Sequence, residues 1–210
     1  LVQDTEEQVD QYEDRLGTYI VKITSSELTQ QQNEDIYQFL HAITDLERIS
    51  DHASNIAENA REIHEKSIPL EGEVEKEIDV MNGAITEVVD TALKALIEKD
   101  PATARHVEPL EELIDNLCDA MKHRQIDRLT RGVYSRQNSF VFNDLIANYE
   151  RVSDHCSNIA GCLIETDEKT NLHAYLHDVK ENDEQFRNEY REYAEEYFRR
   201  LDSAEVKTEA

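Results

Sequence analysis

The chain is poor in residues that interrupt or cross-link a fold. Its 210 residues include five glycines, three prolines and three cysteines. Because glycine and proline dominate tight turns, their scarcity disfavours a fold of many short strands. The cysteines, Cys118, Cys156 and Cys162, form no Cys-x-x-Cys pair and no disulfide framework, which indicates reduced thiols in the cytosol.

Positive charge and long apolar runs are also scarce. The 22 basic residues stand against 47 acidic ones, which gives a net charge of −25. This charge repels phosphate backbones, so nucleic acid is excluded as a partner, and cations or basic protein surfaces are favoured. No stretch approaches the ~18 apolar residues of a membrane span, and the start of the chain is too acidic for a signal peptide. We therefore expect a cytoplasmic domain with only indirect membrane contact.

Apolar residues recur at spacings of three and four, the period of an α-helix. The clearest stripe consists of Val74, Ile78, Met81, Ile85, Val88, Ala92 and Ala95. The pattern predicts an all-α fold with helices at 3–24, 28–66, 73–99, 101–131, 136–166 and 181–202. Asp100 and Pro101 are typical of a helix start, and Pro109 is expected to kink the helix that follows.

The two halves of the chain repeat one another. At an offset of 103, residues 47–57 match residues 150–160 at nine of eleven positions, and residues 6–14 match 111–119 more weakly. The motifs recur in the same order with similar separations, which indicates a duplicated helical unit. We divide the chain into a repeat at 1–66, a repeat at 73–166 and a tail at 167–210.

The first repeat has one helix fewer than the second. Its opening helix would lie before Leu1, so we expect the chain to have been cut from a longer protein. The tail carries Phe186, Tyr190, Tyr193, Tyr197 and Leu201 at helical spacing. We therefore expect the first helix of repeat 1 to be missing, or to be replaced by this C-terminal helix.

Acidic residues border the expected core. On a helical projection Leu46, Ala53 and Ala57 centre the buried stripe of their helix, while Glu47 and Asp51 form a row along its edge. Carboxylates four residues apart repel one another, and partial burial raises the cost of each charge. We therefore expect a cation to offset this repulsion.

A second acidic row faces the first if the helices pair as a hairpin. Convergent oxygens are the ligands that hard or borderline metal ions need, so each repeat is predicted to hold one metal site. His52 and His155 project from another flank and are interpreted mainly as supporting residues. The alternative is a solvated helix edge neutralised by Arg48 and Arg151. The acidic rows and their amide neighbours are Glu6, Asp10, Asp14, Glu47, Asp51 and Asn55 in repeat 1, and Glu111, Asp115, Asp119, Glu150, Asp154 and Asn158 in repeat 2.

The segment Asp45-Leu-Glu-Arg-Ile-Ser-Asp-His-Ala-Ser-Asn-Ile-Ala-Glu58 resembles the signature helix of the PhoU family of phosphate-uptake regulators, and residues 148–161 resemble it too. The resemblance covers residues 1–166. It implies tandem three-helix bundles related by a pseudo-twofold axis, and multinuclear iron clusters or other divalent or trivalent ions held by paired acidic motifs. Carried over to this sequence, it names Glu47, Asp51, Glu150 and Asp154, with Glu6, Asp10, Glu111 and Asp115 as partners, and more weakly Asp14, Asp119, Asn55, Asn158, His52 and His155.

The function that the resemblance implies is regulation of phosphate uptake without catalysis. The missing first helix is similar to the cytoplasmic PhoU-like domain of a sodium-dependent phosphate cotransporter. The implied partners are the membrane transporter portion of the same or another chain and a sensor kinase, at the inner face of the plasma membrane. A homo-oligomer is compatible with this interpretation.

Two other interpretations stay open. A carboxylate-bridged di-iron oxidoreductase is the main rival, because helix bundles also build oxygen-activating sites. Its usual Glu-x-x-His pairing is absent, since no histidine has a glutamate three residues before it. The other is a metal-free helical scaffold that binds partner helices.

Overall fold

The computed structural model describes residues 1–24, 27–68, 72–132, 136–164, 180 and 183–203. These ranges are all-helical, as predicted, and contain no strand. None of their helices is apolar over a length that would cross a bilayer. The helices are α1 (Val2–Ile23), α2 (Gln30–Glu65), α3 (Glu73–Glu98), α4 (Pro101–Ala104), α5 (Val107–Thr130), α6 (Arg136–Ile164) and α8 (Glu184–Ser203).

Local sequence signals set several helix starts. Thr29 begins α2 with a capping box, in which its hydroxyl accepts from the Gln32 backbone N–H and the Gln32 side chain accepts from the Thr29 N–H. Asp100 caps α4 by accepting from the backbone N–H groups of Ala102 and Thr103, with Pro101 as the first helical residue. The expected helix start at Asp100 and Pro101 is therefore confirmed.

The expected kink at Pro109 takes a different form. The predicted helix 101–131 is divided into α4 and α5 by a break at Arg105 and His106, and Pro109 lies in the first turn of α5. Proline has no N–H to donate, and its ring clashes with the carbonyl four residues earlier, which here belongs to Arg105. The helix is therefore interrupted before the proline. It restarts so that Pro109 lies in the first turn of α5, where backbone N–H groups have no partner within the helix.

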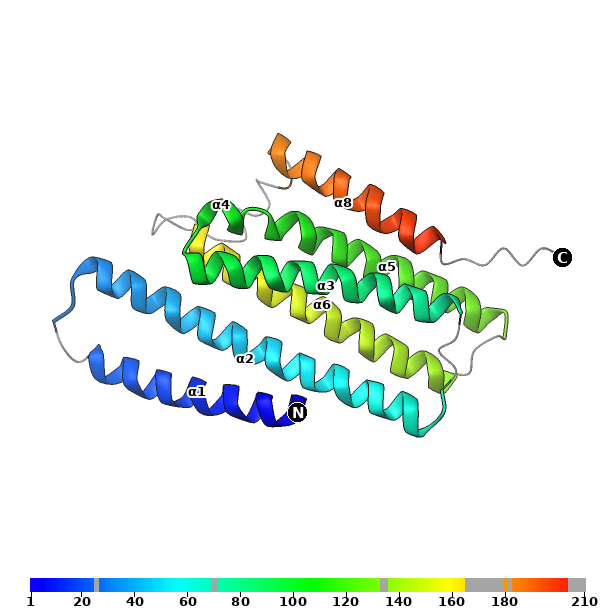
Figure 1. Ribbon diagram of the computed structural model, residues 1–210, viewed down its shortest axis with the longest axis horizontal. Coiled ribbons are helices and arrows are strands. Elements are labelled where there is room, and N and C mark those ends of the chain that lie inside the picture. The colour runs from blue at the N-terminus through cyan, green and yellow to red at the C-terminus, as the bar shows by residue number, and fades with distance from the viewer. Residues whose placement is uncertain (25–26, 69–71, 133–135, 165–179, 181–182, 204–210) are drawn as a thin grey trace.

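The helices form two unequal units that lie side by side. In Figure 1, α1 and α2 form a hairpin, and α2 packs along α6, which belongs with α3 and α5 to a three-helix bundle. Because 47–57 and 150–160 are the matching segments, α2 and α6 are equivalent helices that meet along a pseudo-twofold axis. Likewise, α1 begins at Val2 and α5 at Val107, which agrees with the offset of 105 between Glu6 and Glu111.

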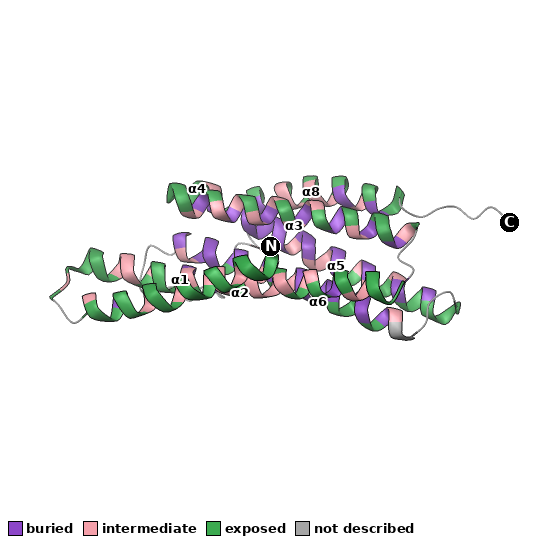
Figure 2. Cartoon of the chain, turned by 60° about the horizontal axis from the view of Figure 1, so that its bottom comes forward, coloured by how far each residue is buried: buried purple, intermediate pink, exposed green. Residues whose placement is uncertain are grey.

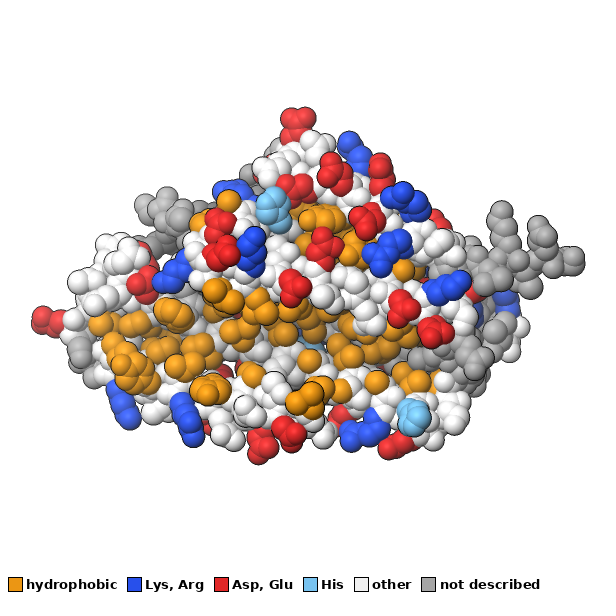
Figure 3. All heavy atoms as spheres, in the orientation of Figure 1, with side chains coloured by type: hydrophobic (Ala, Val, Ile, Leu, Met, Phe, Trp, Pro, Cys, Tyr) orange, Lys and Arg blue, Asp and Glu red, His pale blue; other side chains and the backbone are white. Residues whose placement is uncertain are grey.

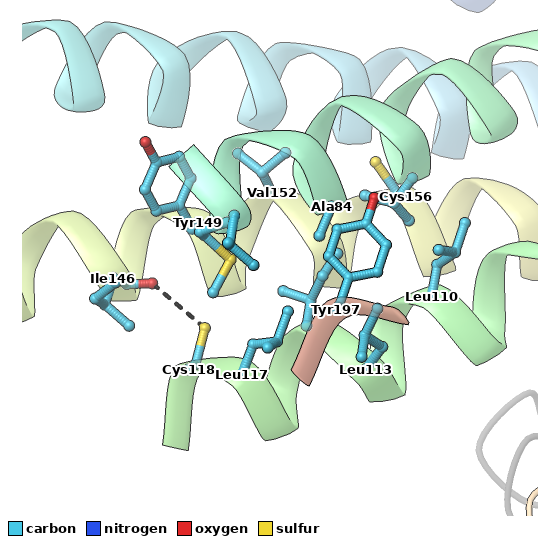
Figure 4. Close-up of a cluster of buried hydrophobic side chains, with 14 of the residues drawn as sticks. Ala84, Leu110, Leu113, Leu117, Cys118, Ile146, Tyr149, Val152, Cys156 and Tyr197 are labelled. Atoms are coloured by element: carbon cyan, nitrogen blue, oxygen red, sulfur yellow. Dashed lines mark hydrogen bonds between the residues drawn. The ribbon is translucent and has the colours of Figure 1, made fainter. Parts of the chain in front are cut away.

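The hydrophobic core lies mainly in the three-helix bundle (Figure 2). Val74, Met81, Val88, Ala92 and Ala95 are all buried, and Ile78 and Ile85 pack against them, so the predicted stripe of α3 is confirmed. Figure 4 shows how side chains from α5, α6 and α8 close the same core. The residues labelled there are Ala84, Leu110, Leu113, Leu117, Cys118, Ile146, Tyr149, Val152, Cys156 and Tyr197.

The C-terminal helix does not take the place of the missing first helix. α8 packs on α5 and α3, where Leu201 and Tyr197 are buried in the bundle core and the Tyr197 hydroxyl donates to Glu87 at 2.6 Å. The replacement hypothesis was therefore wrong. The aromatic side chains of α8 pack on the outside of repeat 2, because α3 and α5 also present apolar side chains there.

The stripe predicted for α2 was wrong as well. Ala53 is exposed, and the buried residues of α2 are instead Ala42, Asp45 and Asn59. The stripe through Leu46, Ala53 and Ala57 corresponds to Tyr149, Cys156 and Ala160 in repeat 2, all of which are buried. In repeat 1 no described helix stands where α3 stands in repeat 2, so this stripe is left open.

Candidate metal centres

The first acidic cluster joins α1 to α2. Glu6 and Asp10 lie one turn apart on α1, and Asp51 faces them from α2. One carboxylate oxygen from each of these three residues lies within 4.8 Å of the other two. Two oxygens that share a cation at about 2.0 to 2.6 Å lie at most about 4.0 to 5.2 Å apart, so the spacing of the first triad is compatible with one ion.

The surroundings of the first triad are open and polar. A cavity of about 510 Å³ adjoins Glu6 and Asp51. Asn55, one of the weaker candidates, lines this cavity. Its other lining residues are Gln3, Glu7, Ser54 and Glu58.

Glu47 lies beside the first triad. Partial burial raises its pKa, and the negative charge of Asp51 adds to this effect. Desolvation and the neighbouring Asp10 and Asp51 raise the pKa of Glu6 in the same way. Arg48 lies 3.3 Å from Glu47 and 3.4 Å from Asp51, so it forms the expected ion pair with the acidic row without removing its excess negative charge.

The second triad repeats the first between α5 and α6. It consists of Glu111, Asp115 and Asp154, again with one oxygen from each within 4.8 Å of the others. These residues are the equivalents of Glu6, Asp10 and Asp51 at the repeat offsets. The duplication therefore reproduces the arrangement of carboxylates as well as the sequence.

The second triad is more deeply buried than the first, because the three-helix bundle surrounds it. Burial, reinforced by Glu108, raises the pKa of Glu111 to about 8. Burial and the charges of Asp154 and Glu150 raise the pKa of Asp115 to about 6. The pKa of Asp154 is raised by burial too. Among the described residues the buried Oδ1 atom of Asp115 has no hydrogen-bond partner, so this oxygen is available to a ligand.

An internal cation adjoins the second triad. The Lys180 ammonium lies 3.2 Å from Glu108, 3.0 Å from Glu111 and 2.8 Å from Glu112. Hydrogen bonds and charges from these carboxylates outweigh its desolvation and raise the pKa of Lys180. The sequence interpretation missed Lys180, because it lies in the tail, outside the duplicated segments that identified the other residues.

The remaining candidates lie outside the triads. Glu150, beside the second triad, is paired with Lys122 at 2.6 Å, and its charge raises the pKa of both Asp115 and Asp154. Asp14 and Asp119 are exposed at the ends of their rows. Asn158 donates to Asp45 at 3.2 Å.

The two histidines meet between the repeats. His52 and His155 stack with their ring centroids 5.7 Å apart. The Nδ1 atom of His155 lies 2.9 Å from Asp45, and that of His52 lies 2.9 Å from Asn148, the equivalent of Asp45. Each histidine therefore bridges α2 and α6, and neither belongs to a triad.

The chemistry of both triads is that of a cation site. All the convergent donors are carboxylate oxygens, which suit hard ions such as Mg²⁺, Mn²⁺, Ca²⁺ or iron. Burial is the main cause of the raised pKa values at both triads, and the neighbouring carboxylates add to it. A bound cation would stabilise the ionised carboxylates and would tie α1 to α2, or α5 to α6.

Comparison with known proteins places the chain in a family. The family model described as PhoU domain matches residues 1–60 and 78–163. The chain is 30% identical over 149 residues to the phosphate-specific transport system accessory protein PhoU homolog 1 of Thermotoga maritima. This match covers 71% of the chain and 63% of that relative, so the chain spans under two thirds of its length.

A solved structure shows the same fold. The crystal structure of PhoU from Pseudomonas aeruginosa matches with a TM-score of 0.72 at 22% identity, and the match covers 78% of each chain. The family match spans both repeats and both acidic triads. The chain belongs to the PhoU domain family.

Proposed function

We propose that this chain is a metal-binding regulatory domain that controls phosphate uptake. The observation that carries the proposal is the pair of equivalent carboxylate triads, one in each repeat, with raised pKa values in both. Stability alone disfavours this clustering of like charges at two equivalent places. The name of the Thermotoga maritima relative, an accessory protein of a phosphate-specific transport system, supports the regulatory role.

The proposed metal ligands are Glu6, Asp10 and Asp51 at one site and Glu111, Asp115 and Asp154 at the other. Glu47 and Glu150 stand at equivalent places beside them, and they provide further carboxylates for a second ion such as iron in a multinuclear cluster. Metal occupancy fixes the spacing of neighbouring helices and thereby changes the surface that the domain offers to a partner. We propose the membrane portion of a sodium-dependent phosphate cotransporter as this partner, with a sensor kinase as the alternative, at the inner face of the plasma membrane.

One observation favours a metal-free scaffold at the second site. Lys180 already supplies a positive charge to Glu108, Glu111 and Glu112. By contrast, no lysine is paired with the first triad among the described contacts. An oxidative di-iron site gains no comparable support, because neither triad includes a histidine.

Metal titration tests the proposal. Purified protein is stripped with a chelator and titrated with Mn²⁺, and bound metal is measured by calorimetry and by electron paramagnetic resonance. We expect at least two bound ions per chain, one of which is lost in Asp51→Asn and the other in Asp154→Asn. Asp14→Asn is the matched control, since this exposed aspartate lies on the same helix as Glu6 but outside the triad.

The regulatory part of the proposal is tested in cells. Phosphate uptake is compared between cells that carry the wild-type domain and cells that carry Asp51→Asn with Asp154→Asn, at high and low external phosphate. We expect the double variant to lose the repression of uptake at high phosphate. Stoichiometric Mn²⁺ binding with unchanged uptake control would retain the metal sites and reject the regulatory role.

A further inference from the structure

The polar cavity of repeat 1 corresponds to a place in repeat 2 that an ammonium group occupies. In repeat 2 the Lys180 ammonium contacts three glutamates of α5 at 3.2 Å or less. These glutamates are Glu108, Glu111 and Glu112. Their equivalents at the repeat offset of 105 are Gln3, Glu6 and Glu7 of α1, and all three line the cavity. The cavity is therefore the equivalent of the Lys180 site.

The third carboxylate of this place changes helix between the repeats. Gln3 stands where α5 carries Glu108, so α1 supplies one glutamate fewer than α5. On the facing helix, Glu58 of α2 stands where α6 has Gly161, and Glu58 lines the cavity. The Gln3 side-chain amide donates to Glu58 at 3.5 Å, so the Glu58 carboxylate reaches the position of the missing glutamate. Each repeat thus surrounds this place with three glutamates.

Repeat 1 has these carboxylates without a lysine of its own among the described residues. Arg61 lies 3.3 Å from Glu58 on the same helix, whereas Glu6 and Glu7 belong to no described ion pair. In repeat 2 the ammonium belongs to the chain that follows α6. The chain that follows α2 instead enters α3 at Glu73. The duplication has therefore kept the glutamates and not the internal cation.

The seat of α3 corresponds to a different surface of repeat 1. In repeat 2, α3 closes a core that includes Met121 and Phe142. Their equivalents, Leu16 and Phe39, line an apolar groove, and Figure 3 shows hydrophobic side chains gathered over this region. No residue lines both the groove and the polar cavity. A helix seated on repeat 1 as α3 is seated on repeat 2 would therefore leave the polar cavity open.

We propose that the polar cavity of repeat 1 binds the side-chain ammonium of a lysine from a partner protein, in the way that repeat 2 binds Lys180. Acidic residues alone would not identify a ligand. The ligand class follows from the ammonium group that the equivalent residues hold in repeat 2. An ammonium has three N–H donors and no acceptor, so it can bond one carboxylate with each donor.

NMR titration with n-butylammonium tests the proposal, because this ion reproduces the end of a lysine side chain. The protein is kept in chelator at low salt. We expect saturable shifts of the backbone amide resonances of residues 3–7 and 54–58, with a Kd on the order of 1 mM. The matched probe is n-butyltrimethylammonium, which has the same charge and no N–H donor. It is expected to bind at least fivefold more weakly.

Variants outside the triads separate this site from the proposed metal sites. Glu7→Gln and Glu58→Gln are each expected to weaken n-butylammonium binding at least threefold, and both variants should still bind Mn²⁺ at both triads. Asp14→Asn, at an exposed aspartate of α1 away from the cavity, is the control and should leave n-butylammonium binding unchanged. Mn²⁺ binding without n-butylammonium binding would reject the lysine site and retain the metal function.

Removal of the internal ammonium tests the equivalence of the two places. Lys180→Ala deletes the ammonium and leaves Glu108, Glu111 and Glu112 in place. This variant is expected to bind n-butylammonium at a second site, with saturable shifts of the amide resonances of residues 108–112. The wild-type protein should show no saturable shifts there, because Lys180 already occupies the site.

An end-blocked glycine-lysine-glycine peptide tests whether the ammonium belongs to a protein. We expect this peptide to bind at least as tightly as n-butylammonium, and the same peptide with an acetylated lysine to cause no saturable shift.

Three outcomes overturn the proposal. One is the absence of saturable shifts at residues 3–7 and 54–58. Another is equal binding of n-butylammonium and n-butyltrimethylammonium, which would show a diffuse attraction to negative charge. The third is binding of n-butylammonium without binding of the lysine peptide, which would assign the cavity to a free amine.

Discussion

Lys180 forms an ion pair with Glu111 at 3.0 Å and places a positive charge beside the second triad. Glu111 is one of the three residues whose oxygens converge there. The first triad has no lysine among its described ion pairs, although Arg48 contacts Asp51 from outside. Among the described ion pairs, a lysine ammonium therefore accompanies the second triad but not the first.

This difference predicts competition between Lys180 and a metal ion. We expect Lys180→Gln to raise the affinity of the second site for Mn²⁺ by about tenfold, because the ammonium no longer repels the ion and no longer holds Glu111. The measurement is calorimetric titration in an Asp51→Asn background, which leaves only the second site to report. Lys66→Gln, at an exposed pair with Glu62, is the control and should not change the affinity. Equal affinities for Lys180→Gln and the control would show that Lys180 does not compete.

The second triad also predicts how stability depends on pH. The pKa of Glu111 is about 8 and that of Asp115 about 6 in the folded protein, above their ordinary values of 4.5 and 3.8. The folded state therefore binds more protons than the unfolded state between these values. The resulting stabilisation is complete below pH 4 and is lost as the pH rises through 6 and then 8.

The expected result is a fall in unfolding free energy of about 4 kcal/mol between pH 5 and pH 8.5, mostly from Glu111, measured by urea unfolding in chelator. Glu111→Gln should remove most of this slope, since the amide does not titrate. Glu75→Gln, at an exposed position of α3, serves as the control. A wild-type stability that stays level or increases over this range would contradict the burial of these carboxyl groups.

The convergence of the six triad carboxylates follows from helical periodicity and duplication acting together. A spacing of four places Glu6 beside Asp10 and Glu111 beside Asp115, and similar hairpin lengths bring Asp51 and Asp154 opposite them. The roles of Glu47 and Glu150 were less predictable. Glu150 is drawn to Lys122 on the neighbouring helix, and only the packing of α5 against α6 shows this pairing.

Long-range placement was the part that the sequence did not determine. The aromatic stripe of α8 predicted that this helix packs, but two apolar surfaces were available to it, and it covers α3 and α5 instead of the open face of repeat 1. Lys180 was missed for a related reason. Its contacts with Glu108 and Glu111 depend on the path of the tail, which no repeat or periodicity specifies.

The buried ion pair between Glu77 and Arg128 predicts a large asymmetric effect on stability. Glu77 is fully buried, and its Oε2 atom has no hydrogen-bond partner among the described residues. Arg128→Met leaves Arg124, 3.5 Å away, as the remaining cation beside this charge among the described residues, and should cost about 3 kcal/mol in urea unfolding. Adding Glu77→Leu should restore more than half of the loss, because the double variant no longer buries an unpaired charge. A double variant that is less stable than Arg128→Met would show that the pair itself supplies the stability.

The last prediction concerns the packing of α8 on the second repeat. Leu201 is fully buried in the bundle core, so Leu201→Ala should lower the unfolding free energy by about 3 kcal/mol. Tyr197→Phe, which removes only the hydrogen bond to Glu87, should cost about 1 kcal/mol. An unfolding free energy that Leu201→Ala leaves unchanged would show that α8 does not pack into the bundle core.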